Sequence, residues 1–340
     1  MKTRELVLPS IKDPIKKSPG FHKKELADFK LDIMGKCGFS CSYCSTAATT
    51  PMRVNREKWA DEAERQLGER LLPSAPNLTY RWSDFEERLD AQLATRAKTW
   101  GAGLTLVFSQ LTDAFSPWAV AEGLTRRTLG KVLAKTSFRV RVLTKSAVVG
   151  SPSCVDFFRA YSDRFVVGLS IGTLDDNWAR KVEVGTSSPT ARVKALHALQ
   201  DAGVPTYGML CPIFPDALDG DGVERLVEAI RPDRCETVWS EPFNDRNNHQ
   251  AVANGYDDEA ARIRVTSLFV GGNARASWSY YAQHLYARVH AALGGEAHKH
   301  RYLLYQDTMT ERGREAMRTA EGVLFQSDET KGKKALPVVA

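Results

Sequence analysis

Six short β-rich runs recur along this chain, and segments with helical spacing separate most of them. The runs are Phe29–Met34, Leu104–Ser109, Phe138–Thr144, Phe165–Ile171, Pro205–Leu210 and Glu236–Glu241. The clearest helix is expected at Pro189–Ala202, because a serine or threonine at 186–188 can cap it and Gly203 can end it. Strands that alternate with helices form parallel sheets through right-handed crossovers. We therefore predict an α/β fold, a partial (β/α)6 barrel of the TIM type.

Three parts of the chain do not follow this alternation. About seventy residues separate the first two predicted strands, and helix-like stretches in them predict an inserted helical element at about 52–100. After Glu241 the alternation stops, and aromatic-rich segments predict a helical C-terminal extension at 246–325. We expect the barrel itself at 28–245, after a basic N-terminal segment at 1–27 and before a disordered tail at 326–340.

The composition is typical of a globular protein of a reducing compartment. No stretch approaches the roughly 20 consecutive apolar residues of a membrane span, and the first residues lack the apolar core of a signal peptide. Six cysteines in 340 residues are too few for a disulfide scaffold. The formal net charge of +6 lies partly in lysines near both ends, which are either solvated or in contact with phosphates. We expect a cytoplasmic protein without a membrane partner.

Three of the six cysteines fall within eight positions, directly after the first predicted strand. Cys37, Cys41 and Cys44 give the pattern C-x-x-x-C-x-x-C. Three thiolates this close on one loop can bind three irons of a [4Fe–4S] cluster and leave the fourth iron open to the amino and carboxylate groups of a cofactor. A structural zinc site needs four ligands, and no second C-x-x-C pair occurs. We predict the cluster, with zinc or plain buried cysteines as alternatives.

These spacings and their position resemble the radical S-adenosylmethionine superfamily, over roughly 28–244. In that family an aromatic residue commonly precedes the third cysteine and lies near the adenine, and Tyr43 matches it, although the same ring is equally compatible with core packing. The resemblance implies a [4Fe–4S] cluster, S-adenosylmethionine as cofactor, and a reducing electron donor similar to flavodoxin or ferredoxin.

Polar residues follow the ends of the predicted strands, where barrel enzymes have their active sites. Hydroxyl, lysine and carboxamide groups match the carboxylate, ribose and adenine of S-adenosylmethionine. Taken singly, each could equally be a strand-end cap or a surface residue, and Asp113 could cap the helix that begins near Pro117. The residues, in chain order, are Ser109, Thr112, Asp113, Lys145, Ser170, Glu241 and Asn244.

This order of residues is similar to the spore photoproduct lyase branch of the superfamily. There a Ser/Thr-Asp pair follows the second strand, Thr-Lys-Ser ends the third and a serine ends the fourth. By this resemblance Lys145 and Ser170 would contact the methionine or ribose part of the cofactor, and Ser109 or Thr112 would add a hydroxyl. Residues such as Glu183 and Arg192 would support the pocket, unless they form only a local salt bridge.

The chain departs from that branch at its hydrogen donor. The branch has a cysteine just before the Ser/Thr-Asp pair, whereas this chain has Gln110 in that neighbourhood and no cysteine between Cys44 and Cys154. The same hydrogen relay is therefore not expected. Cys211, directly after the fifth predicted strand, could donate hydrogen from another wall because an S–H bond is weak, or it could pack as a small hydrophobe.

We expect a radical S-adenosylmethionine enzyme that forms a 5′-deoxyadenosyl radical and abstracts hydrogen from a substrate, either a nucleic acid or nucleotide, or else a peptide or small metabolite. A partner protein from a neighbouring gene is a further expectation. The rival from another class is a non-enzymatic nucleic-acid-binding or sensor protein with an iron–sulfur or zinc centre. Aromatic rings suited to base stacking are Trp239, Phe243, Trp278, Tyr280 and Tyr281.

Overall fold

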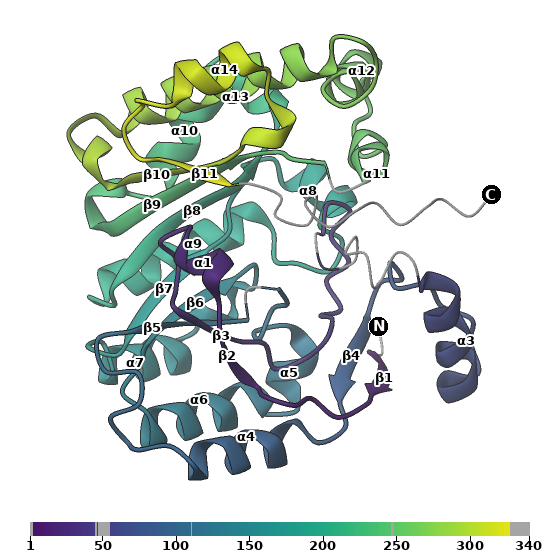
Figure 1. Cartoon of the computed structure of the whole chain (residues 1–340), viewed down its shortest axis with the longest axis vertical. Coiled ribbons are helices and arrows are strands. Elements are labelled where there is room, and N and C mark those ends of the chain that lie inside the picture. Colours follow the sequence, from purple (N-terminus) through teal and green to yellow (C-terminus); the bar gives the residue numbers. More distant parts are fainter. Residues whose placement is uncertain (1–2, 45, 47–54, 110, 246–247, 327–340) are drawn as a thin grey trace.

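A nine-stranded sheet forms the centre of the computed structural model, which describes residues 3–44, 46, 55–109, 111–245 and 248–326 (Figure 1). Neighbouring strands are parallel, except that the edge strand β2 runs antiparallel to β3. In spatial order the strands are β11 (Val323–Gln326), β10 (His300–Tyr305), β9 (Cys235–Pro242), β8 (Thr206–Ile213), β7 (Phe165–Leu169), β6 (Arg139–Thr144), β5 (Thr105–Phe108), β3 (Phe29–Leu31) and β2 (Ile15–Lys17).

All six predicted strands are present, as β3 and β5 to β9, and their spatial order follows the chain. The prediction of an α/β fold with a mainly parallel sheet is therefore confirmed. The number of strands was wrong, because β2, β10 and β11 extend this sheet at its two edges. These strands have three to six residues, and edge strands need no long apolar run. The curling of the sheet into a partial barrel stays a prediction.

Helices connect the parallel strands and cover the sheet. The predicted helix at Pro189–Ala202 is α9 (Pro189–Asp201), and the hydroxyl of Ser188 accepts the N–H of Ala191 at its start. No described helix is long and apolar enough to cross a membrane. The other helices from β5 onward are α5 (Pro117–Ala121), α6 (Leu124–Lys135), α7 (Pro152–Ala160), α8 (Asp176–Val182), α10 (Gly222–Ala229), α11 (His249–Ala253), α12 (Glu259–Ser267), α13 (Ala274–Leu293) and α14 (Glu311–Met317). Short 3₁₀ turns lie at Ala147–Gly150, Pro215–Leu218, Pro232–Arg234, Gly294–Lys299 and Gln306–Thr308.

The segment between β3 and β5 contains a strand as well as helices. It has α3 (Arg56–Leu67), β4 (Leu78–Trp82) and α4 (Phe85–Ala94). β4 pairs in parallel with β1 (Arg4–Leu8) to form a separate two-stranded sheet. The first residues of the chain are thus built into the fold through β1, β2 and the short helix α1 (Pro19–His22). The predicted tail lies outside the described residues, apart from Gln326 at the end of β11.

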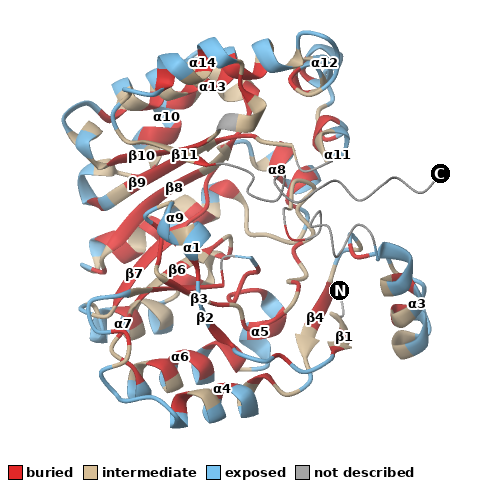
Figure 2. Cartoon of the chain, viewed as in Figure 1, coloured by how far each residue is buried: buried red, intermediate tan, exposed pale blue. Residues whose placement is uncertain are grey.

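The two faces of the main sheet bury different side chains, and Figure 2 shows its strands buried between exposed helix surfaces. One face packs against the helices. The other, which we call the inner face, has an aromatic cluster in which the guanidinium of Arg141 lies 4.6 Å from the ring centre of Trp239 and 5.3 Å from that of Tyr207. Gly168 on β7 makes room for this cluster, because a Cβ atom there would overlap the ring of Tyr207. The candidate site lies at the carboxyl ends of these strands, next to the inner face.

Candidate active site

The three clustered cysteines lie on the loop that follows β3, and backbone hydrogen bonds fix this loop from two sides. The N–H of Asn77, just before β4, donates to the carbonyl of Gly38 at 3.1 Å. The N–H of Ser42 donates to the carbonyl of Val182 at 2.7 Å, at the end of α8. Gly185 approaches the loop so closely that a Cβ atom would lie 2.9 Å from the Cα of Phe39. The loop conformation is therefore determined by the insertion and by the segment after α8.

Burial and neighbouring negative charges raise the pKa of two thiols of this loop, Cys37 and Cys41, and keep them protonated when no metal is bound. Burial, followed by the charge of Cys44, raises the pKa of Cys37 to about 12. Burial also raises the pKa of Cys41 well above its usual value, and Glu183 adds to that effect. Because thiolates rather than thiols bind metals, iron binding at this loop would release protons.

The donor set fits an iron–sulfur cluster in its chemistry. The charge of Cys44 raises the pKa of both Cys37 and Cys41, and Cys37 adds to the shift of Cys41, so these side chains lie close enough to interact. Among the described residues, no three His, Cys, Asp or Glu side chains form a group that could hold a metal ion. In a cubane cluster each thiolate binds its own iron, so the three sulfurs need not converge on one point.

Lys36 adds a buried positive charge beside the cysteines. Its ammonium donates to the carbonyl of Leu78 at 2.7 Å and to that of Cys37 at 3.2 Å. Burial lowers the pKa of Lys36, while the three cysteines oppose that shift. A cation in this position would offset the negative charge of thiolates. Sequence analysis missed this role, although the position directly before Cys37 was a usable signal.

Glu183 connects several of the predicted site residues. It accepts hydrogen bonds from the hydroxyl of Tyr43 and the guanidinium of Arg192, and the ammonium of Lys145 lies 3.6 Å from its Oε1. The side chains of Glu183 and Arg192 are 3% and 0% exposed. Burial by itself would raise the pKa of Glu183, but Lys145, Arg192 and Tyr43 together hold it below its usual value. The carboxylate is therefore ionised and shared by three partners.

Ser170 joins this group to the end of β8. It accepts a hydrogen bond from the ammonium of Lys145, and its hydroxyl donates to the carbonyl of Cys211 at 2.7 Å. The guanidinium of Arg192 donates to the carbonyl of Ser170 at 2.6 Å. Tyr43, Lys145, Ser170 and Arg192, which the sequence predicts as one site, are thus brought together in the structure.

Asp113 lies behind Lys145 rather than beside an open space. Its carboxylate accepts the hydroxyl of Thr144 and the backbone N–H of Lys145, both at 2.7 Å, and the N–H of Phe115 at 2.9 Å. Burial raises the pKa of Asp113 to about 6. It does not cap α5, whose N-cap residue is Ser116. In this structure Asp113 positions the backbone from which Lys145 extends.

Cys211 on β8 and Glu241 on β9 form a second, adjoining pair. The thiol donates to Oε2 of Glu241 at 2.9 Å. Burial and then Glu241 raise the pKa of Cys211 well above its usual value, so the sulfur keeps its hydrogen. Nearby, the ammonium of Lys24 donates to the hydroxyl of Tyr305 at 2.8 Å. Burial lowers the pKa of Lys24, but Glu241 and Tyr305 outweigh it and the net shift is upward.

Three of the predicted residues lie outside this network. Ser109 is buried with a left-handed backbone (φ 57°), and its hydroxyl has no hydrogen-bond partner in the described part of the chain. Thr112 turns away from Lys145 and contacts Asp32 at 3.5 Å. The side-chain oxygen of Asn244 is buried without a partner among the residues described. Gln110 lies outside the described residues.

Four of the five aromatic residues expected to stack on bases are core residues. Trp239, Phe243, Trp278 and Tyr281 are each at most 3% exposed. Trp278 donates its indole N–H to the carbonyl of Phe243 at 3.0 Å, inside the fold. Only Tyr280, on α13, is exposed among the five. The sequence interpretation of the other four as stacking platforms was wrong, because all four are buried in the interior of the fold.

Comparisons with known proteins find relatives that are uncharacterized and a solved structure with the same fold. No protein-family model matches the chain. An uncharacterized protein of Methanocaldococcus jannaschii is 29% identical over 127 residues, which are 37% of this chain and 46% of that protein, so this chain matches less than half of that relative's length. An uncharacterized protein of Acidianus two-tailed virus is 22% identical over 223 residues, 65% of this chain and 68% of that protein.

Among solved structures, a tyrosine-to-phenylalanine mutant of spore photoproduct lyase is similar to this chain. The TM-score is 0.53 at 14% identity, over 88% of this chain and 81% of that one. A further mutant of spore photoproduct lyase, with bound AdoMet and dinucleoside spore photoproduct, gives a TM-score of 0.45 at 14% identity, over 74% of this chain and 66% of that one. The first likeness establishes that the two chains share a fold.

Proposed function

We propose that this chain is a radical S-adenosylmethionine enzyme, with a [4Fe–4S] cluster held by Cys37, Cys41 and Cys44. When bound, the cluster would supply one electron to S-adenosylmethionine, whose C5′–S bond breaks to give methionine and a 5′-deoxyadenosyl radical that removes a hydrogen atom from the substrate. The proposal depends above all on one observation, the buried group of Tyr43 and Lys145 around Glu183 next to the cysteine loop.

The degree of burial distinguishes the residues of this group that can contact a ligand from those that only position them. Arg192 and Glu183 are almost fully buried, whereas the side chain of Lys145 is 16% exposed. Lys145 is therefore the cation that we assign to the carboxylate or ribose of S-adenosylmethionine, together with Ser170. Arg192, Glu183 and Asp113 position it. Buried charges carry a large desolvation penalty, and a purely structural metal site would not require them.

We assign Cys211 the role of hydrogen donor. Transfer of a hydrogen atom from its thiol to a product radical forms the C–H bond, breaks the S–H bond and leaves a thiyl radical. An electron from the flavodoxin- or ferredoxin-like donor and a proton would restore the thiol. Glu241, in hydrogen-bond contact with the sulfur, is the group that would pass that proton.

We propose a nucleic acid or nucleotide as the substrate and the cytoplasm as the location. The shared fold with spore photoproduct lyase supports the substrate class. Exposed lysines of the N-terminal segment support it as well, because phosphates attract them. They are Lys12, Lys16 and Lys17.

The test is anaerobic reconstitution with iron and sulfide, followed by dithionite, S-adenosylmethionine and an assay for 5′-deoxyadenosine. About four irons per chain and formation of 5′-deoxyadenosine are expected. Cys37→Ala, Cys41→Ala and Cys44→Ala should abolish both, and Cys154→Ala, a half-buried cysteine on α7, is the matched control. Lys145→Met should retain the iron content of the wild-type protein but no longer bind S-adenosylmethionine. Uptake of zinc, or a reduced cluster that leaves S-adenosylmethionine intact, would refute the proposal.

A further inference from the structure

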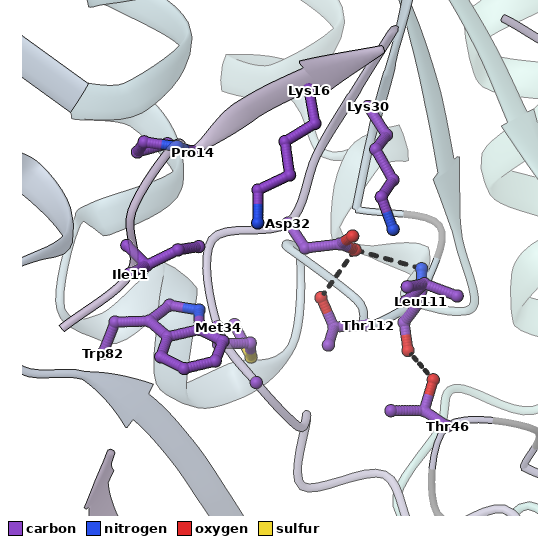
Figure 3. A pocket seen from close by; sticks show the side chains of 11 residues that line it. Ile11, Pro14, Lys16, Lys30, Asp32, Met34, Thr46, Trp82, Leu111 and Thr112 are labelled. Atoms are coloured by element: carbon purple, nitrogen blue, oxygen red, sulfur yellow. Dashed lines mark hydrogen bonds between the residues drawn. The ribbon is translucent and has the colours of Figure 1, made fainter. Parts of the chain in front are cut away.

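A cavity of about 160 Å³ opens beside the cysteine loop, separate from the group around Glu183 (Figure 3). Neither the three cysteines nor Tyr43, Lys145 or Ser170 line it. Thr112 connects the two places, because it lines the cavity while its neighbour Asp113 holds the backbone of Lys145. The side chains that matter for its chemistry are those of Lys16, Lys30, Asp32, Met34, Trp82 and Thr112.

Two lysines of like charge stand directly opposite each other at this cavity. Lys16 on β2 pairs with Lys30 on β3 in the antiparallel register, so both side chains lie on one face of the sheet. Like charges in this arrangement destabilise a sheet. Neither lysine forms an ion pair within the described part of the chain, although the Lys30 ammonium lies 5.9 Å from the ring centre of Phe21 and its charge acts on Asp32. Figure 3 shows both lysines extending toward the space beside Asp32. This pair provides a site for an anionic group.

Asp32 and Trp82 offer one acceptor and one donor on the wall of the same cavity. The carboxylate of Asp32 accepts the N–H of Leu111 at 3.0 Å and, more weakly, the hydroxyl of Thr112 at 3.5 Å. A carboxylate has about four lone-pair positions, so it can accept a further N–H group. The indole nitrogen of Trp82 is buried and has no hydrogen-bond partner among the described residues. A buried donor of this kind calls for an acceptor on a ligand.

The size and the apolar walls of the cavity suit a small flat ring. An apolar cavity of about 150 Å³ is known to hold benzene, so the volume of about 160 Å³ is enough for one six-membered ring. The ring of Trp82 and the side chain of Met34 form apolar walls against which a flat ring can stack. A flat ring with adjacent N–H and C=O groups and an attached anion matches all of these features.

We propose that this cavity binds an unmodified pyrimidine nucleotide that flanks the reacting position of a nucleic-acid substrate. The base lies against Trp82 and Met34, donates an N–H to Asp32 and accepts the indole N–H of Trp82. The phosphate binds between Lys16 and Lys30. This inference rests on the proposed function and adds a recognition site to it, because contacts away from the reacting atoms supply binding energy that positions them.

Isothermal titration calorimetry of the full-length, reconstituted protein tests the pocket with thymidine 5′-monophosphate, thymidine, inorganic phosphate and deoxyadenosine 5′-monophosphate. We expect the thymidine nucleotide to bind at least about tenfold more tightly than the other three. The double variant Lys16→Gln, Lys30→Gln should lose about tenfold for the nucleotide and keep its affinity for thymidine. Asp32→Asn should weaken both. Lys194→Gln is the matched control, because Lys194 is an exposed lysine on α9 that does not line this cavity.

Three results would overturn the proposed pocket: no binding of the thymidine nucleotide, equal affinity for the adenine nucleotide, or an equal loss of affinity in Lys194→Gln. Unchanged thymidine binding in the double lysine variant shows that it is folded. The assays for iron content and for 5′-deoxyadenosine test the proposed function separately from these binding measurements. Nucleotide binding without cofactor cleavage would refute the proposed function and retain the pocket, whereas cleavage without nucleotide binding would do the reverse.

Discussion

Arg192 and Glu183 form an ion pair with almost no contact with solvent. Arg192 also holds the carbonyl of Ser170, so one guanidinium connects α9 to the end of β7 and to the segment after α8. Such a pair is costly to bury, and removal of one partner leaves the other charge uncompensated. The stability of the protein and the geometry of the site therefore depend on the same contact.

Arg192→Ala should lower the free energy of unfolding by about 3–5 kcal/mol, because Glu183 loses its buried partner. Urea unfolding followed by circular dichroism measures this change. Arg159→Ala is the control, since Arg159 pairs with Asp156 on the exposed side of α7, where a change within about 0.5 kcal/mol is expected. Similar losses in the two variants would contradict a special role for the buried pair.

Asp113 should make the free energy of unfolding decrease as the pH rises. Its pKa is raised from 3.8 to about 6 in the folded protein, so the folded state holds the proton more tightly than the unfolded state. Its contribution to stability is complete below about pH 4 and is lost as the pH rises to about 6, at a cost of about 3 kcal/mol. Unfolding free energies at pH 4, 5, 6 and 7 measure this slope. Asp113→Asn should flatten it, whereas the exposed Asp156→Asn should leave it unchanged.

Cys211→Ala should leave cluster loading and 5′-deoxyadenosine formation unchanged but prevent hydrogen return to the product. In heavy water the thiol exchanges its hydrogen, so an oligonucleotide product should gain one deuterium from the wild-type protein and none from this variant. Mass spectrometry of the oligonucleotide measures this difference. Cys235→Ala, which removes a buried thiol near Ile230, is the control. Deuterium incorporation that persists in Cys211→Ala would exclude this thiol as donor.

Gly168→Ala should destabilise the protein by about 1–3 kcal/mol, because the added methyl group overlaps the ring of Tyr207, whose hydroxyl is fixed to the carbonyl of Val142 at 2.9 Å. Gly130→Ala on α6 meets open space and should stabilise the protein by about 0.5–1 kcal/mol through its helix propensity. Thermal unfolding of both variants checks the opposite signs. A tolerated methyl group at Gly168 would show that the inner face is more loosely packed than described.

The sequence predicts the central strands well because buried parallel strands appear as short apolar runs between helices. It predicts β4, β10 and β11 poorly because these strands owe their pairing to distant partners. Lys145 and Ser170 could be placed together because both follow neighbouring strands. Glu183 was expected to support the pocket only by resemblance, and its contact with Lys145 could not be predicted from the residues, since Glu183 lies in the loop after α8. Thr112 contacts Asp32, whereas its neighbour Asp113 holds the backbone of Lys145, because successive residues after β5 point in different directions.

The bond between Lys24 and Tyr305 has a consequence for the order in which the protein is made. These residues are 281 positions apart, and a second link nearby joins Glu25 to Arg301 at 2.6 Å. During synthesis, the early segment that carries Lys24 leaves the ribosome long before β10 exists. The side of the candidate site next to Glu241 is therefore completed only after β10 has been synthesised.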